Sequence, residues 1–312
     1  MEQIVKKLPT PIVGLMLGLA ATGNLIQSYG NVLRNIFGLI SGIILVLILI
    51  KIVKYPKGVK EALDNPVVSS VFPTLSMGIM LIATYLKPYF GSASFIIWII
   101  GVIVHIILII TFSRKYLLNF NIKKVFPSWF IVYVGIVVAS VTAPAFEMQK
   151  FGQIIFWFGL ISYLILLPVI LKRIFIIKEI PEPALPTITI LCAPASLCLA
   201  GYMNSFTDKN MIIVWGLLAI SQITYIAVIV NMPKLLKLKF YPSYSGFTFP
   251  LVISALSLKL TNGFLIKVGT PIPMLKYLVN FEELIAVLIV LYVLVKYISF
   301  LITKDVVTGK SA

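Results

Sequence analysis

Residues 186–206 of this chain read PTITILCAPASLCLAGYMNSF, and residues 210–231 read NMIIVWGLLAISQITYIAVIVN. The first stretch contains two prolines, Pro186 and Pro194, among small residues, whereas the second is an unbroken apolar run. Each is long enough to cross a membrane as one helix, which takes roughly 20 residues. We interpret the pair as a helical hairpin in which the first helix is interrupted and the second is smooth.

The same hairpin recurs five times along the chain. The proline that opens each interrupted segment returns at intervals of 55, 61, 59 and 56 residues, at Pro11, Pro66, Pro127, Pro186 and Pro242. A second helix-weakening residue follows each of them seven or eight residues later, at Gly18, Pro73, Gly135, Pro194 and Pro250. A fixed period is typical of a repeated supersecondary unit. Hydropathy then predicts ten transmembrane helices, at 9–28, 33–53, 66–86, 93–113, 127–146, 151–171, 186–206, 210–231, 243–264 and 279–302.

Composition supports a membrane protein. Of the 312 residues, 60% are hydrophobic and only 12% are charged, and the mean hydropathy is +1.06. These values exclude an ordinary soluble domain. Because the ten spans leave no room for a linker, we expect residues 1–312 to form a single transmembrane domain.

Basic residues are distributed unevenly between the two sides of the predicted membrane domain. Seven of the 26 Lys and Arg residues fall on one side: Arg34, Lys87, Lys150, Lys209, Lys259, Lys267 and Lys276. The other side, which holds both termini, carries the rest, and the positive-inside rule predicts that this side is cytoplasmic. The net charge of +16 is then mainly a topology signal, and we expect anions and anionic lipid head groups as partners and no nucleic acid.

The two kinds of helix predict an inner and an outer ring. An interior proline frees a backbone carbonyl, which in a membrane must be satisfied by protein or by a water-filled cavity. Small residues allow backbones to approach closely or leave space in a lumen. The smooth helices are rich in Ile, Leu, Val and Phe, and their surfaces lose nothing by facing lipid. We therefore expect the five interrupted helices to surround a pore; the alternative is that the prolines only set kinks in a packed bundle.

The permeant species is predicted from the charges near the pore. Within the spans, the ionisable residues are His105, Lys259, Glu282, Glu283 and Lys296. We interpret His105 as a packed histidine, and the two glutamates as carboxylates that begin the last helix and complement its dipole. Lys259 either reaches the outer interface or attracts anions into an outer vestibule. The amino-terminal ends of the interrupted helices converge with the lysine-rich loops, so anions are favoured over cations.

Catalysis and cofactor chemistry are not indicated. The chain has one histidine, no metal-ligand spacing and no nucleotide-binding loop. We therefore expect no enzyme activity, no metal and no cofactor. Cys192 and Cys198 are six residues apart on one helix, which turns them about 240° apart, so they cannot bridge each other.

Five short motifs resemble those of one membrane family, in order and on the interrupted helices. The motifs are Leu8-Pro9-Thr10 followed by Gly14, Asn65-Pro66-Val67, Pro127-Ser128-Trp129-Phe130, Ala193-Pro194-Ala195 and Gly246-Phe247-Thr248-Phe249-Pro250. In these residues the chain resembles the tellurite-resistance/dicarboxylate transporter family, to which the plant guard-cell slow anion channels are related. The chain departs from the pattern at Tyr133 and Val134, which are bulkier than their counterparts and bear on the width of the lumen.

The resemblance implies ten helices in quasi-fivefold hairpins, assembled as homotrimers with one pore per subunit. It also implies that Phe249 plugs the pore midway and that Gly14 faces its ring. A phenyl ring cannot coordinate an ion, and in a narrow lumen it forms a hydrophobic constriction.

Three functions are compatible with these features. The first is a gated, passive anion channel of a bacterial cytoplasmic membrane, occluded by Phe249 and permeable to small monovalent anions. The second is a secondary carrier of C4-dicarboxylates such as malate, with proton linkage through Glu282 or Glu283. The third is a membrane scaffold or sensor that conducts nothing.

Overall fold

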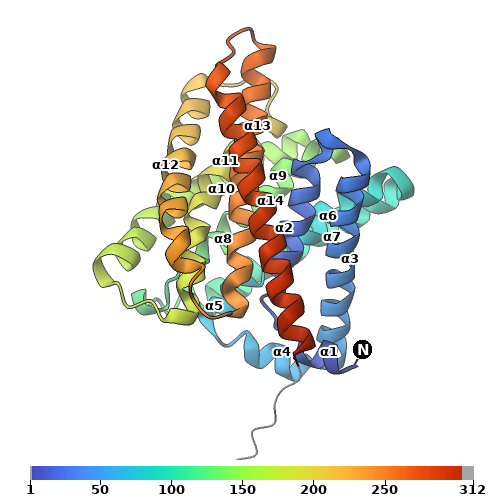
Figure 1. The fold of residues 1–312 in the computed structure, drawn as a ribbon, viewed down its shortest axis with the longest axis vertical. Coiled ribbons are helices and arrows are strands. Elements are labelled where there is room, and N and C mark those ends of the chain that lie inside the picture. The colour runs from blue at the N-terminus through green and yellow to red at the C-terminus, as the bar shows by residue number, and fades with distance from the viewer. Residues whose placement is uncertain (1, 304–312) are drawn as a thin grey trace, which may run out of the picture.

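The computed structural model describes residues 2–303, and the elements that this part of the chain forms are helices joined by short loops (Figure 1). Lys304 and Lys310, two of the basic residues assigned to the side that holds both termini, lie outside the described residues. The first helix, α1 (Glu2–Lys7), and the end of the last one meet at one face of the molecule, where the Lys7 ammonium donates to the Thr303 carbonyl at 2.5 Å. We call this face the terminal face and the opposite one the far face.

Five long, smooth helices form the outside of the molecule. They are α3 (Asn31–Lys54), α7 (Ser92–Phe112), α10 (Gln149–Leu171), α12 (Met211–Leu235) and α14 (Pro273–Ile302). Only 22–33% of the residues in their most apolar stretches are buried. An apolar surface of this length that faces away from the protein is typical of contact with lipid.

The interrupted segments lie inside this shell. They are α2 (Ile12–Leu25), α5 (Pro66–Val71) with α6 (Thr74–Phe90), α8 (Trp129–Tyr133) with α9 (Val138–Thr142), α11 (Ala193–Ser205) and α13 (Thr248–Lys267). Short 3-10 turns complete them at Gly135–Val137, Ala143–Phe146, Glu182–Cys192 and Pro242–Phe247. Three of these segments, Pro66–Phe90, Glu182–Ser205 and Pro242–Lys267, are as long as the outer helices. In their most apolar stretches, 61–89% of the residues are buried.

The inner helices close into a ring. In chain order α2 contacts α6, α6 contacts α9, α9 contacts α11, α11 contacts α13, and α13 returns to α2. Each inner helix also packs on the smooth helix that follows it, so the ring is surrounded by its own five partners. The predicted all-α fold of hairpins in a quasi-fivefold arrangement is confirmed.

The helices that could span a membrane by length and composition number eight among the described residues. The first and fifth predicted spans correspond to shorter apolar helices, Ile12–Leu25 and Gly135–Phe146. In the fifth span the interruption is extensive, because α8 and α9 are each only five residues long.

Most of the repeated Pro and Gly residues mark the start of a helical segment rather than a kink within one. Pro73 precedes α6, Gly135 opens a 3-10 turn, Pro194 is the second residue of α11 and Pro250 the third of α13. A proline in the first turn costs little, because the backbone N–H it lacks has no partner within the helix. Gly18 differs from these four, since α2 continues through it; one interior glycine costs only about 1 kcal/mol.

The carbonyls freed by these interruptions find other partners. Pro194 has no N–H to give to the Ile190 carbonyl, and the Ala193 N–H bonds there instead. At the interruption after α8, the His105 Nε2 lies 3.2 Å from the Val132 carbonyl and donates to it. At these two interruptions the backbone carbonyls are thus paired, as the interior of a membrane protein requires.

The last helix begins earlier than predicted. We placed its start at residue 279, but α14 begins with Pro273, which suits a first helical position. Glu282 and Glu283 therefore lie more than two turns inside the helix, too far from its end to complement the dipole there. The interpretation of these glutamates as helix-start carboxylates was wrong.

Candidate functional site

Three cavities follow one another through the ring of inner helices. The terminal vestibule, of 430 Å³, is lined by Pro11, Asn65, Pro66, Val67, Val68, Val71, Phe126, Pro181, Pro183, Ala184, Tyr241, Pro242 and Ser243. The central chamber, of 30 Å³, is lined by Gly14, Val71, Thr74, Met77, Phe130, Ile131, Val134, Gly135, Ile190, Ala193, Pro194, Leu197, Ser245, Gly246, Phe249 and Pro250. The far vestibule, of 300 Å³, is lined by Ala21, Asn24, Gln27, Arg34, Leu81, Thr84, Val138, Val141, Thr142, Ala145, Leu197, Asn204, Phe249, Ile253, Leu256 and Leu260.

The cavities share wall residues where they meet. Val71 lines both the terminal vestibule and the central chamber. Phe249 and Leu197 line both the central chamber and the far vestibule. The three cavities are therefore neighbours in this order, and Phe249 belongs to the wall that the second and the third share.

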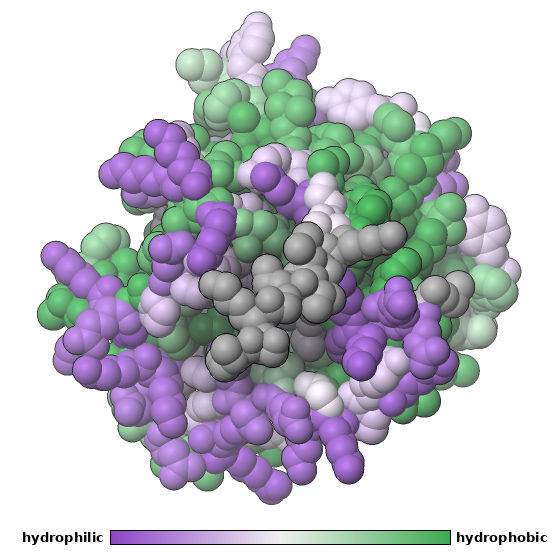
Figure 2. Space-filling model, turned by 60° about the horizontal axis from the view of Figure 1, so that its bottom comes forward, coloured by the Kyte–Doolittle hydropathy of each residue, from purple (hydrophilic) through white to green (hydrophobic). Residues whose placement is uncertain are grey.

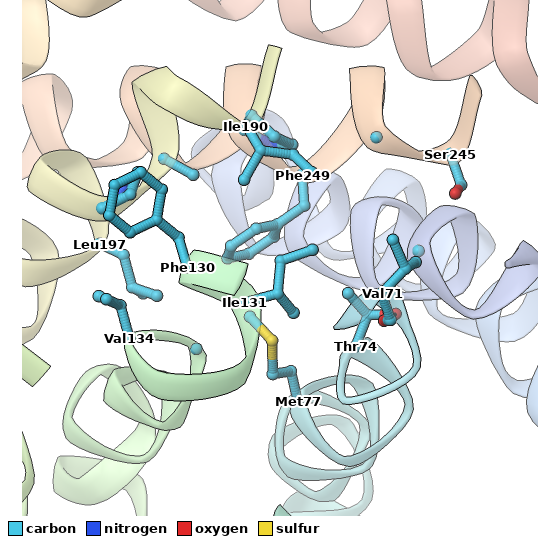
Figure 3. Close-up of a pocket in the computed structure, with 16 residues that line it drawn as sticks. Val71, Thr74, Met77, Phe130, Ile131, Val134, Ile190, Leu197, Ser245 and Phe249 are labelled. Carbon is cyan, nitrogen blue, oxygen red and sulfur yellow. The ribbon is translucent and has the colours of Figure 1, made fainter. Parts of the chain in front are cut away.

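The central chamber is narrow and almost entirely apolar. All five hairpins contribute to its wall, and its only side-chain hydroxyls belong to Thr74 and Ser245. Figure 3 shows the Phe249 side chain reaching toward Ile131, while the Ser245 hydroxyl is turned away from it. A cavity of 30 Å³ is only two to three times the roughly 10–15 Å³ that one water molecule needs, which is too small for an anion with a complete hydration shell.

Two glycines bring α2 close to the residues around Phe249. A Cβ added at Gly14 would lie 2.9 Å from the Cβ of Ser245, and one at Gly18 would lie 2.4 Å from the Thr248 hydroxyl oxygen. The Thr248 hydroxyl also lies 3.1 Å from the Gly14 carbonyl. This is the close approach that small residues four apart allow between membrane helices. Gly14 thus lines the same chamber as Phe249, but its nearest neighbour is Ser245.

The structure brings together most of the residues predicted for the pore. Gly135, Pro194 and Pro250 line the central chamber, as Gly14 and Phe249 do. Two others, Gly18 and Pro73, are in the wall of none of the three cavities.

The two bulky residues at which the sequence departs from the family pattern have different places. Val134 lines the central chamber. Tyr133 does not, because its hydroxyl lies 2.9 Å from the Ser113 hydroxyl, beside the end of α7. Of the two, only Val134 narrows the lumen.

The terminal vestibule opens on a face where hydrophilic side chains gather, whereas the sides of the molecule are largely hydrophobic (Figure 2). Its wall holds no ionisable group other than Tyr241. Two carboxylates outside this wall are paired with lysines: Lys115 lies 2.5 Å from Asp64 and Lys123 2.8 Å from Glu179, and the hydrogen bond and charge of the lysine lower the pKa of each carboxyl. An anion that approaches from this side meets little repulsion.

The far vestibule contains a single charged residue in its wall, Arg34. Lys259, for which the sequence left open either the outer interface or an outer vestibule, is absent from this wall. Its ammonium lies 2.5 Å from a carboxylate oxygen of Glu283 and 2.9 Å from the Leu25 carbonyl. Tyr29 donates to the other oxygen of Glu283 at 2.8 Å. Lys259 is thus part of an ion pair between α13 and α14, and Arg34 is the vestibule cation.

The remaining ionisable groups of the spans lie behind the ring. Glu282 is buried and accepts a hydrogen bond from the Ser254 hydroxyl at 2.8 Å, but it lines none of the three cavities. His105 is buried between α6 and α8, with Nδ1 2.8 Å from the Ser76 hydroxyl. It joins two interrupted helices, as a packed histidine does.

Comparison with known proteins agrees with this geometry. Residues 8–298 match the voltage-dependent anion channel family, which covers nearly the whole chain. The chain belongs to this family. It is also similar to a curated protein named as an uncharacterized transporter of Methanocaldococcus jannaschii, with 26% identity over 243 residues, or 67% of this chain and 68% of that protein.

Membership of the voltage-dependent anion channel family makes this chain an anion channel or transporter with several transmembrane helices. The sequence did not identify two residues that line the cavities, Arg34 and Leu197. Arg34 was counted only as one of the few basic residues on its side. Leu197 carried no signal at all, because an apolar residue in a buried helix can face a lumen or a neighbour with equal ease.

Proposed function

We propose that this chain is a gated, passive anion channel whose conduction path is closed at rest by Phe249. The observation that carries the proposal is the position of that ring, in the wall of two successive cavities. An apolar ring in so narrow a route makes an ion lose its water without offering a polar substitute, which is how a hydrophobic gate stops conduction.

Charge along the route supports anions as the permeant class. Among the residues that line the three cavities there is no Asp or Glu, and the one that carries a full charge at neutral pH is Arg34. Small monovalent anions fit best, since a single cation offers little to offset the larger hydration energy of a dianion.

A proton-linked dicarboxylate carrier is the second candidate, and Glu282 favours it. This buried carboxyl bonds to Ser254 on α13, five residues from Phe249 on the same helix, so its protonation could be coupled to movement of the gate. A carrier of this kind moves protons and substrate in a fixed ratio, whereas a channel does not.

The test is to reconstitute the purified protein in liposomes and measure anion flux and internal pH together. We expect little anion movement in wild type and, in a variant with Phe249 truncated, a current that reverses near the chloride equilibrium potential with no proton movement tied to it. Malate uptake with a constant proton-to-malate ratio would instead establish the carrier. No anion movement of either kind, in wild type and in a variant with Phe249 truncated, would leave the scaffold as the explanation.

A further inference from the structure

The Arg34 side chain is held in a fixed position at the wall of the far vestibule. Its Nε donates to Asn24 Oδ1 at 3.1 Å, and its Nη2 donates to the Thr84 carbonyl at 3.4 Å. The guanidinium lies over the Tyr85 ring, 4.2 Å from the ring centre, which is close enough for a cation–π interaction. The Tyr85 hydroxyl in turn donates to the Ala20 carbonyl at 2.6 Å.

Two glycines make room for this support. A Cβ at Gly38 would lie 2.5 Å from the Tyr85 ring, and a Cβ at Gly23 would lie 2.3 Å from its hydroxyl oxygen. Larger residues at either position would displace Tyr85 and, with it, the guanidinium. The local sequence is therefore shaped around the place where Arg34 lies.

The polar groups at this wall have hydrogen-bond donors to spare. A guanidinium has five N–H groups, and the contacts with Asn24 and Thr84 use two of them. Because Asn24 presents its oxygen to Arg34, its NH2 group is turned the other way, and Asn24 also lines the vestibule.

The two threonine hydroxyls of the same wall use their protons within their own helices, so the donors left for a ligand are those of Arg34 and the side-chain amides. The Thr84 hydroxyl gives its proton to the Leu81 carbonyl at 2.7 Å, and the Thr142 hydroxyl gives its proton to the Val138 carbonyl at 2.8 Å. No carboxylate lines the cavity, so nothing in the wall neutralises Arg34. A cavity of 300 Å³ also has room for an ion together with part of its water.

We propose that Arg34 and the amide of Asn24 bind a small monovalent anion, such as chloride or nitrate, in the far vestibule. The site rests on the anion-channel function proposed above and adds a binding step to it, one that holds the anion on the far side of Phe249. A monovalent ion is specified because Arg34 is the single full charge in the wall and its charge-assisted hydrogen bonds suit one negative charge.

Binding can be measured without conduction, by the broadening of the chloride NMR line in solutions of the detergent-solubilised protein. We expect wild type to broaden the line in a saturable way, and nitrate to compete. Arg34→Gln and Asn24→Asp should each weaken the apparent affinity by roughly tenfold or more, the order expected from one lost charge-assisted hydrogen bond. Asn24→Asp keeps an oxygen for the Arg34 Nε, so it retains the local geometry even if Arg34→Gln folds poorly.

The matched control for Asn24→Asp is Asn210→Asp. Asn210 caps α12 through a 2.8 Å bond from the Ile212 N–H and does not line the vestibule. Aspartate caps helices as well as asparagine does, so this variant adds the same charge to the far face without touching the site. Chloride binding should be unchanged in it.

The outcomes separate this site from the channel itself. Absence of saturable chloride binding in wild type, or equal binding in wild type and Asn24→Asp, would overturn the site. If chloride binds and the binding depends on Arg34, but a variant with Phe249 truncated carries no anion current, the site stands and the channel proposal fails. Stronger competition by malate than by nitrate would contradict the assignment of a monovalent ligand.

Discussion

Replacing Phe249 with Ala is the perturbation for which the structure gives a magnitude. In wild type, an anion that moves from the far vestibule to the central chamber must pass an apolar ring in a space of 30 Å³. The cost of placing a charged side chain at the centre of a membrane helix, about 2.5–3.5 kcal/mol, indicates the size of the barrier. Removing the ring joins the chamber to the vestibule of 300 Å³ and admits water.

A barrier lowered by about 2.5–3.5 kcal/mol corresponds to roughly a 70- to 400-fold faster passage. We therefore expect Phe249→Ala to raise chloride current by about two orders of magnitude in planar bilayers, without a change in which ions pass. The stability cost should stay below the 3–5 kcal/mol typical of a buried phenylalanine, because Phe249 already borders two cavities.

The control is Phe264→Ala, the same change on the same helix at a position that lines none of the three cavities. It should leave the current at the wild-type level. Equal currents in wild type and Phe249→Ala, with both proteins folded and inserted to the same extent, would refute the reasoning. So would an increase of similar size in Phe264→Ala, since a general loosening of α13 would then explain both.

Substitutions at three further positions probe the surroundings of the gate. Gly14→Ala should disturb packing against Ser245 and lower the free energy of unfolding by about 1–3 kcal/mol. Gly14→Asp also adds a negative charge to the chamber, so it should carry much less anion current than Gly14→Ala. Equal currents in the two variants would show that the charge has no effect. Gly18→Val should lower thermal stability in detergent, because its Cβ would overlap Thr248, and a melting temperature equal to that of wild type would contradict the packing. Glu282→Gln should leave anion current and its pH dependence unchanged in a channel, whereas loss of substrate uptake together with proton movement would favour the carrier.

The general architecture could be predicted because its signals are carried by residue type and spacing. Smooth apolar runs predicted the outer helices, and the periodic prolines predicted which helices lie inside. Gly18 shows a limit of the second signal, because glycine serves equally to weaken a helix and to let two helices approach, and only the neighbour Thr248 distinguishes these uses. The predicted start of the last helix was wrong, because the charge of Lys276 kept the residues after Pro273 out of the predicted apolar span although they are helical.

The candidate site was less accessible to sequence reasoning. Phe249 was identified only through its motif. Without the motif it would have been taken as a core residue, because an aromatic residue beside a proline usually is one. Arg34 could not be distinguished from other basic residues of its side, because its place in the vestibule depends on contacts with Asn24 and Tyr85. The pairing of Lys259 with Glu283 across two helices likewise arises only in the folded chain.

The central claim is that the inner helices enclose a route open to water from each face and interrupted at Phe249. Labelling of single-cysteine variants with a charged, membrane-impermeant thiol reagent tests this claim directly. The cysteine replaces Val68 in the terminal vestibule, Asn204 in the far vestibule or Ile43 on the outside of α3. Both native cysteines are buried, so the wild-type protein gives the background. We predict that Val68→Cys reacts only from the terminal side, Asn204→Cys only from the far side, and Ile43→Cys from neither. Reaction at Ile43→Cys with the other two silent, or reaction at either vestibule position from both sides, would contradict the account.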